Sequence, residues 1–264
     1  MGKIIMIASL KGGVGKTTVT AALAHALSSL GHRTLAVDMD FGVRSLDIAL
    51  GWQNSASPSC WDVMMGKASL GIATDTDDEK NENLFFLSAP MNVDCTYDTD
   101  FTDKMFLNFL RSAKREFDYV LLDMAAGPGR LLDMASASGE VDETLIVCTQ
   151  NTASVRAAEK LGSALYRGEG EEISLVINSF EFKRAKSESE VGVMSISELS
   201  SLTLKGVIPF DKRVERNLSN GRPLTSDRRS KAGRALMNIA KRLIGAETPL
   251  FEGVYPKTRR MKLY

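Results

Sequence analysis

The chain has 264 residues, and its 33 lysines and arginines balance 33 aspartates and glutamates. This length suits one large α/β domain with a sizeable core, and a formal net charge of +0 provides no overall basic field that would attract nucleic acid. The three cysteines, Cys60, Cys95 and Cys148, form no Cys-x-x-Cys pair, which argues against a zinc or iron–sulfur centre and fits a reducing cytosol.

The first predicted elements are a buried strand at 4–8 and a helix at 19–30, with the segment Lys-Gly-Gly-Val-Gly-Lys-Thr-Thr at 11–18 between them. Strand, glycine-rich loop and helix in this order are the context of a phosphate-binding loop, here called the phosphate loop. Glycines let backbone N–H groups turn toward an anion, and the helix N-terminus adds its positive end. We expect Lys16 to reach the β- and γ-phosphates and Thr17 to hold Mg²⁺. The residues expected to contact the nucleotide here are Gly12, Gly13, Val14, Gly15, Lys16, Thr17 and Thr18.

Further apolar runs alternate with helical stretches along the chain. Runs that are apolar throughout suit strands covered on both faces, so the pattern predicts a doubly wound, mostly parallel α/β sheet with helices on both faces. Ligands then bind at the carboxyl ends of the strands. The stretches 73–83 and 181–195 are expected to be loops. The predicted strands are 34–37, 84–87, 119–122, 143–148, 173–177 and 206–208, and the predicted helices are 59–66, 101–116, 129–138, 152–167, 212–219 and 228–244.

Carboxylates follow two of these predicted strands. Asp38 and Asp40 come at the end of the strand at 34–37, and Asp123 follows the strand at 119–122. An apolar run that ends in a carboxylate places that group near the water shell of a metal. Phosphoryl transfer to water mainly requires a positioned nucleophile and neutralised charge, which such residues supply.

Two features narrow the interpretation. The phosphate loop has Leu10 where the usual pattern has glycine, and it adds a second lysine, Lys11. The second is the pattern Asp-x-Asp-x-Gly-x-Arg-x-Leu-Asp at 38–47. Together they resemble the MinD/ParA family of deviant Walker A ATPases, over about residues 2–245. The resemblance implies the P-loop NTPase fold, ATP and ADP as ligands, and Mg²⁺.

The resemblance also implies roles for individual residues. Lys11 would reach the nucleotide of a second subunit in an ATP-dependent homodimer. Asp40 would position the attacking water, and Asp38 would support Mg²⁺ through water. Asn178 would face the adenine, and the loop Pro209-Phe210-Asp211 would line its other side. Asp123 would belong to a Walker B strand, although Ala125 stands where the family normally has proline.

Cell-division members of this family cycle between monomer and membrane-bound dimer. The resemblance therefore implies slow ATP hydrolysis stimulated by a partner, a division-inhibitor partner, and a cytoplasmic protein that is peripheral on the inner face of the membrane. We expect residues 1–245 to form the ATPase domain and 246–264 a basic tail. The tail could bind anionic lipid as a short helix through Met261, Leu263 and Tyr264, or be a disordered solubilising segment.

Several alternatives stay open at this point. One is a ParA-type partitioning ATPase that binds DNA, which the neutral charge makes a weaker interpretation, and another is a flagellar-number regulator of the same family. An iron–sulfur carrier or nitrogenase-type reductase lacks its paired cysteines here, and a carboxylate-activating ligase on the same fold is disfavoured by Lys11. The predicted helix at 228–244 has a basic outer face that could bind DNA or acidic lipid, or could simply be solvated.

Overall fold

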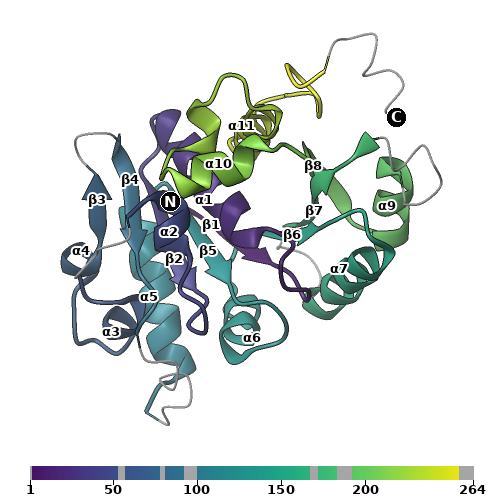
Figure 1. Cartoon of the computed structure of the whole chain (residues 1–264). Coiled ribbons are helices and arrows are strands. Elements are labelled where there is room, and N and C mark those ends of the chain that lie inside the picture. Colours follow the sequence, from purple (N-terminus) through teal and green to yellow (C-terminus); the bar gives the residue numbers. More distant parts are fainter. Residues whose placement is uncertain are drawn as a thin grey trace.

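Eight strands form one sheet in the order β3-β4-β2-β5-β1-β6-β7-β8 (Figure 1). The structure is a computed structural model, and it describes residues 2–52, 57–77, 81–91, 100–166, 172–182 and 192–255. The strands pair in parallel except at one edge, where β3 runs antiparallel to β4. The predicted doubly wound, mostly parallel sheet is confirmed. The strands are β1 (Lys3–Ala8), β2 (Thr34–Met39), β3 (Asp75–Asp77), β4 (Asn81–Leu87), β5 (Tyr119–Met124), β6 (Glu143–Cys148), β7 (Glu172–Phe180) and β8 (Thr203–Pro209).

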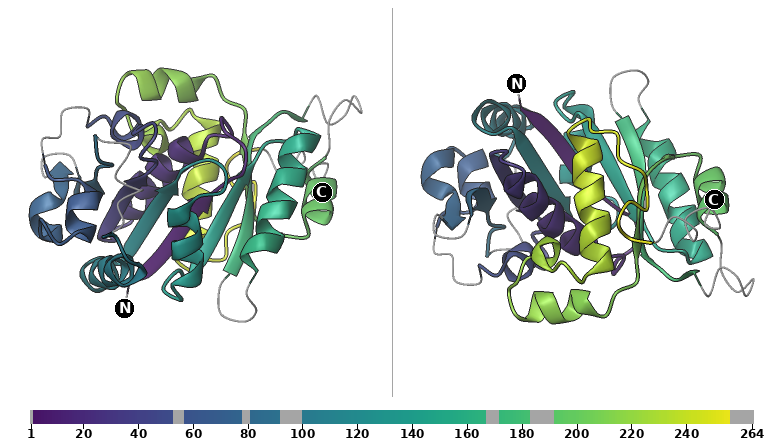
Figure 2. Two further views of the ribbon diagram at one scale, coloured as in Figure 1. Left: turned by 90° about the horizontal axis from the view of Figure 1, so that it is seen from below. Right: turned by 90° about the horizontal axis from the view of Figure 1, so that it is seen from above.

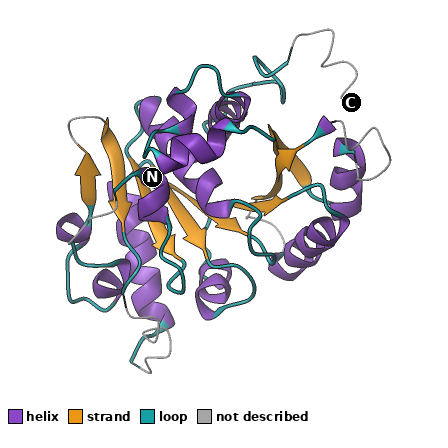
Figure 3. Cartoon of the chain, viewed as in Figure 1, coloured by secondary structure: helices purple, strands orange, loops and turns teal. Residues whose placement is uncertain are grey.

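Helices cover both faces of the sheet. The two views of Figure 2 show α1 (Lys16–Ser29) and α11 (Lys231–Leu243) on one face, and α5 (Asp103–Glu116), α6 (Arg130–Ala137) and α7 (Thr152–Leu165) on the other. With both faces covered, the central strands are buried almost throughout, which explains their continuous apolar sequences. The remaining helices are short and lie at the ends of the sheet (Figure 3): α2 (Leu46–Leu50), α3 (Cys60–Met64), α4 (Leu70–Ala73), α9 (Val193–Ser200), α10 (Arg213–Ser219) and the 3₁₀ turn η2 (Leu224–Ser226).

Both predicted loops contain regular structure, so these two predictions were wrong in part. The stretch 73–83 includes β3 and the start of β4, because an edge strand needs only one partner and its polar side chains stay in contact with water. The stretch 181–195 includes the first residues of α9, which buries Val193 and Ile196. The part of that stretch at 183–191 lies outside the described residues.

The start of the predicted tail packs against the domain. Beyond α11 the chain turns back along this helix, because the Asn238 side chain donates a hydrogen bond of 2.7 Å to the carbonyl of Glu252. Phe251 and Tyr255 are buried, and the Tyr255 ring lies 5.1 Å from Lys231 Nζ at the N-terminal end of α11. The compact unit therefore extends to Tyr255. Residues 256–264, with the predicted lipid-facing Met261, Leu263 and Tyr264, lie outside the described residues.

Among the described residues, none of the helices combines the length and apolar character required to cross a bilayer.

Candidate nucleotide-binding site

The phosphate loop joins β1 to α1 at the carboxyl edge of the sheet. Gly13 and Gly15 have left-handed φ values of +74° and +92°, which glycine adopts without strain. Gly15 is the N-cap of α1, so the free N–H groups of the first helical turn face the loop. Lys16 is only 7% exposed, whereas Lys11 is exposed. The loop thus combines a helix N-terminus, a buried cation and a solvent-facing cation.

Asn178 closes the loop from the side of β7. Its Nδ2 donates a hydrogen bond of 2.8 Å to the carbonyl of Val14. A Cβ atom on Gly15 would lie 2.3 Å from the same Nδ2, so a larger residue here would push the amide away from the loop and would also strain the backbone angle. The β7–β8 pairing is irregular between Ile177 and Phe180, and Ser179 has a φ of +53°. This irregularity places the predicted adenine-facing asparagine against the phosphate loop.

Two predicted metal-site carboxylates lie side by side beneath the loop. Asp38 on β2 and Asp123 on β5 are register partners, and both side chains are fully buried. Burial raises the pKa of Asp38 to about 7, although the backbone N–H of Leu46 opposes the rise, and it raises the pKa of Asp123 to about 6. Two adjacent buried carboxylates repel each other and lack solvent, so a cation placed between them and the loop would stabilise their charged forms.

The oxygen atoms around Asp123 indicate which cation could bind between the two carboxylates and the loop. Its Oδ1 accepts a hydrogen bond of 2.9 Å from the Thr20 hydroxyl, while its buried Oδ2 accepts no hydrogen bond from any described residue. Thr17 lies beside it, since both the Thr17 and Thr20 hydroxyls lower the Asp123 pKa against the effect of burial. A hydroxyl and carboxylates are the hard oxygen ligands that Mg²⁺ prefers, so Thr17, Asp123 and, through water, Asp38 are suited to hold it.

Lys16 carries the positive charge at this position. Burial lowers the pKa of Lys16, and the neighbouring carboxylates of Asp123 and Asp40 oppose that effect. The lysine is therefore desolvated and close to two carboxylates. A phosphate that enters the loop would meet the positive charge of Lys16 with little water between them. Thr18 lies half-buried in the first turn of the same helix.

Asp38 also organises the loop that carries Asp40. Its two carboxylate oxygens accept hydrogen bonds of 2.9 Å from the backbone N–H of Asp40 and 3.0 Å from that of Leu46. Both ends of the segment 40–46 are thereby held by one side chain. Arg44 sits within it at a left-handed φ of +49°, and Asp40 is half-buried at its start.

A second connection joins the phosphate loop to the segment after β5. The backbone N–H of Gly127 donates a hydrogen bond of 2.9 Å to the carbonyl of Ser9, and the Ser9 hydroxyl donates one of 2.8 Å to the carbonyl of Lys11. Gly127 has a φ of +90°. The segment that follows Asp123 is therefore tied to the start of the phosphate loop.

The three residues of the predicted adenine loop, Pro209-Phe210-Asp211, lie in different environments. Pro209 is buried, and Phe210 is 53% exposed. The carboxylate of Asp211 faces α11, because it accepts hydrogen bonds of 2.8 Å from the Ser230 hydroxyl and from the backbone N–H of Lys231. Phe210 thus forms the solvent-exposed part of this loop, and Asp211 caps the N-terminus of α11.

Sequence reasoning missed Thr20 and Ser45. Thr20 lies one helical turn beyond Lys16, on the face of α1 that meets β5, and a search for this (i, i+4) spacing would have found it. Ser45 reaches Thr17 with an oxygen–oxygen distance of 3.5 Å across 28 residues of sequence, and no local pattern predicts that contact.

A doubly wound parallel sheet whose first strand leads through a glycine-rich loop into a helix defines a P-loop NTPase. The family described as "ParA: NUBPL iron-transfer P-loop NTPase" matches residues 1–244. The chain belongs to this MinD/ParA family of P-loop NTPases and is an ATPase.

Within the family the chain is similar to MinD proteins. It is 32% identical to the septum site-determining protein MinD of Bacillus subtilis, over 95% of this chain and 92% of that protein. Its fold superposes on a MinC:MinD cell division protein complex of Aquifex aeolicus with a TM-score of 0.82 and 27% identity, over 94% of this chain and 98% of that one. MinD of Pyrococcus horikoshii, complexed with Mg-ADP, gives a TM-score of 0.78 and 27% identity, over 92% and 96% of the two chains.

Gly15→Ala is expected to weaken ATP binding, because the new Cβ would displace Asn178 from the loop and strain a left-handed residue. Gly31→Ala is the matched control, since Gly31 has a similar φ of +90° but nothing lies within 4 Å of an added Cβ. We expect each variant to lose about 1–2 kcal/mol of unfolding free energy in urea from backbone strain, with a further loss only in Gly15→Ala. Equal losses and unchanged ATP affinity in both would contradict the proposed contact.

Proposed function

We propose that this chain is a MinD-like ATPase whose output is a change of assembly. It binds Mg·ATP, forms a dimer that encloses two nucleotides, engages partners and membrane in that state, and resets by slow, partner-stimulated hydrolysis. The proposal rests on three buried side chains at the phosphate loop, those of Lys16, Asp38 and Asp123. It also rests on Lys11, which is exposed at the start of the loop.

In hydrolysis, a water oxygen bonds to the γ-phosphorus, the bond to the bridging oxygen breaks, and ADP leaves with that electron pair. The water proton passes to an oxygen of the γ-phosphate. Asp40 orients the water by accepting its hydrogen bond, from a segment whose ends Asp38 holds. Lys16 neutralises charge on the β- and γ-phosphates. Thr17 and Asp123 would hold Mg²⁺, which would supply further charge neutralisation.

Lys11 is suited to act on a second subunit. It is exposed at the start of the loop, so its side chain can extend away from its own site. A lysine that reaches the nucleotide of a partner subunit adds positive charge as the transition state forms, as an arginine finger does. Hydrolysis then depends on the dimer, which links nucleotide state to assembly.

Adenine recognition involves Asn178, Pro209 and Phe210 in this proposal. The Asn178 amide can both donate and accept, as an adenine edge requires. One of its two N–H groups already donates to Val14, so its oxygen and its second N–H are available to the base. The exposed Phe210 ring offers an apolar surface for the same base.

The cellular role follows from the relatives. The septum site-determining names of its relatives and the MinC:MinD complex support a role in division-site selection with a division-inhibitor partner. We propose a second, ATPase-stimulating partner and a peripheral position on the inner face of the cell membrane. DNA partitioning is the weaker candidate, because the formal net charge is +0.

Deleting residues 257–264 is expected to abolish ATP-dependent binding to anionic liposomes. The segment carries four basic residues and the apolar Met261, Leu263 and Tyr264, so one copy binds weakly and two copies on a dimer bind by avidity. Sedimentation with liposomes in ATP and in ADP measures this. Equal sedimentation of the intact and shortened chains with ATP would refute a membrane role for the tail, and loss only in the shortened chain would support it.

A further inference from the structure

Five arginines gather around one hollow outside the nucleotide site. The hollow has a volume of about 700 Å³ and lies between α10 and the segment at 220–229. Although the chain as a whole is neutral, residues 212–231 contain seven lysines and arginines and only two acids, Glu215 and Asp227. We call the hollow the arginine hollow; its arginines are Arg213, Arg216, Arg222, Arg228 and Arg229.

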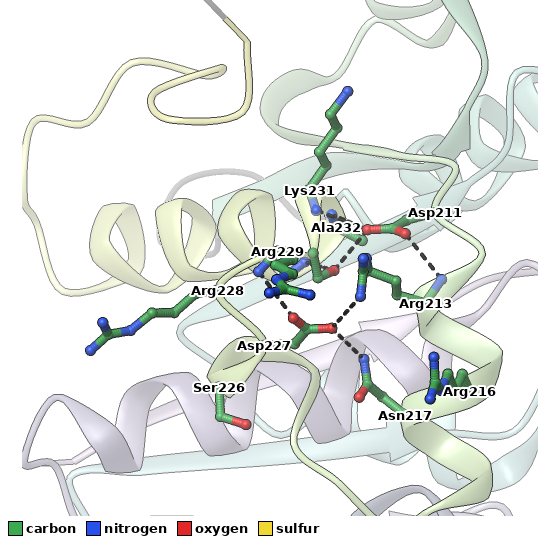
Figure 4. Close-up of polar contacts among 12 residues, drawn as sticks. Asp211, Arg213, Arg216, Asn217, Ser226, Asp227, Arg228, Arg229, Lys231 and Ala232 are labelled. Atoms are coloured by element: carbon green, nitrogen blue, oxygen red, sulfur yellow. Dashed lines mark hydrogen bonds and ion pairs between the residues drawn. The ribbon is translucent and has the colours of Figure 1, made fainter.

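Most of this charge is available to a ligand. Arg213 is the exception, since its guanidinium lies 3.5 Å from Asp227, which also accepts from the Asn217 amide (Figure 4). The side chains of Arg216, Arg228 and Arg229 are exposed and make no hydrogen bond or ion pair with any residue that the structure describes. Figure 4 shows Arg228 extending away from Asp227.

The arginine hollow and the last described residue both lie at the N-terminal end of α11. Tyr255, the last described residue, packs against Lys231. The backbone of Lys231 donates to Asp211, and the same carboxylate accepts a hydrogen bond of 3.0 Å from the backbone of Arg213. This series of contacts joins the start of the tail to the rim of the hollow. The described chain therefore ends against the same end of α11 that borders the arginine hollow.

We propose that the arginine hollow binds the phosphates of anionic phospholipid headgroups while the tail is engaged with the membrane. This inference rests on the proposed membrane function and extends it to a second contact on the folded domain. The planar guanidinium group matches a phosphate with two parallel hydrogen bonds. With the tail inserted at one side, the hollow lies at the headgroup layer and fixes how the domain faces the bilayer.

Nucleic acid is the other source of such phosphates. No aromatic side chain is among the residues that line the hollow, so it offers no platform on which the bases of a single strand could stack. A duplex needs only phosphate contacts, so duplex DNA is one arm of the test. The tail supplies apolar residues together with basic ones. A duplex attracts only the basic residues, whereas a lipid surface accommodates both.

The test uses the full chain with ATP and the triple variant R216Q/R228Q/R229Q. The matched control is R115Q/R156Q/K160Q, which removes the same charge from exposed positions on α5 and α7, on the opposite face of the sheet. Binding is measured to phosphatidylglycerol–phosphatidylcholine vesicles, to phosphatidylcholine vesicles and to duplex DNA, over a range of salt. We expect the triple variant to bind anionic vesicles roughly 10- to 100-fold more weakly, with a shallower salt dependence, while the control binds as the unchanged chain does.

Each other outcome overturns the proposal. Equal weakening by both variants would show a general charge effect, and no weakening by either would leave the hollow without a role at lipid. Loss of DNA binding at unchanged vesicle binding would assign the hollow to nucleic acid. If the unchanged chain forms its ATP dimer but binds no anionic vesicle, both this proposal and the proposed membrane function fail. Vesicle binding that needs residues 257–264 but not the arginines overturns the hollow alone.

Discussion

Lys16→Ala is expected to abolish tight ATP binding. The side chain is buried at the N-terminus of α1, and its charge is the one that phosphates meet on entering the loop. Because charge-assisted hydrogen bonds in a desolvated site are stronger than those in water, we expect ATP affinity to fall by about 100-fold or more. The substitution also leaves Asp123 buried without its nearby cation, which adds to the repulsion of an anionic ligand.

Calorimetric titration with ATP measures this loss. Circular dichroism of the same sample verifies that the variant is folded, and Lys160→Ala, an exposed lysine on α7, controls for the loss of one charge. Near-unchanged affinity in folded Lys16→Ala would overturn the assignment of residues 11–18 as a phosphate loop.

Lys11→Ala and Asp40→Ala are expected to separate assembly from hydrolysis. Without the exposed Lys11, the monomer should bind ATP with little change in affinity but form no ATP dimer, and hydrolysis should fall by about 1000-fold. Without Asp40, the water is poorly positioned, so the dimer should persist with ATP while phosphate release falls by about 100-fold.

Size-exclusion chromatography with ATP and a phosphate-release assay distinguish these outcomes. Lys160→Ala again serves as the control for Lys11→Ala. Normal hydrolysis by both variants would contradict both roles, and a stable ATP dimer of Lys11→Ala would contradict the role of Lys11 alone.

The elements best predicted from sequence are the strands that helices cover on both faces, because their whole length must be apolar. β6 was predicted at 143–148 and found there, because a strand covered on both faces must be apolar along its length. β3 could not be predicted, since its sequence Asp-Thr-Asp has low strand propensity and forms only through pairing with β4. α9 is rich in serine, and the burial of Val193 and Ile196 in the folded chain outweighs that weak propensity.

The residues of the nucleotide site also fall into two groups: those that local sequence predicts and those whose contacts depend on the assembled sheet. The phosphate loop and the two strand-end carboxylates follow from local sequence, because a strand end fixes where its last side chain lies. The contact from Asn178 to Val14 spans 164 residues, and the capping of α11 by Asp211 spans about 20, so both depend on the assembled sheet. Sequence alone indicated where Asp211 lies but not which way its carboxylate faces.

The order of the strands also governs when the phosphate loop can form during synthesis. β1 does not pair with β2, the next strand to be made, but with β5 and β6, so that Lys3 lies opposite Tyr119 and Ile5 opposite Glu143. Parallel pairing over such a long separation in sequence is slow to form. A nascent chain that has not yet reached Tyr119 therefore contains the complete loop sequence without either strand that flanks β1. The nucleotide can stabilise the folded chain only after the centre of the sheet has emerged from the ribosome.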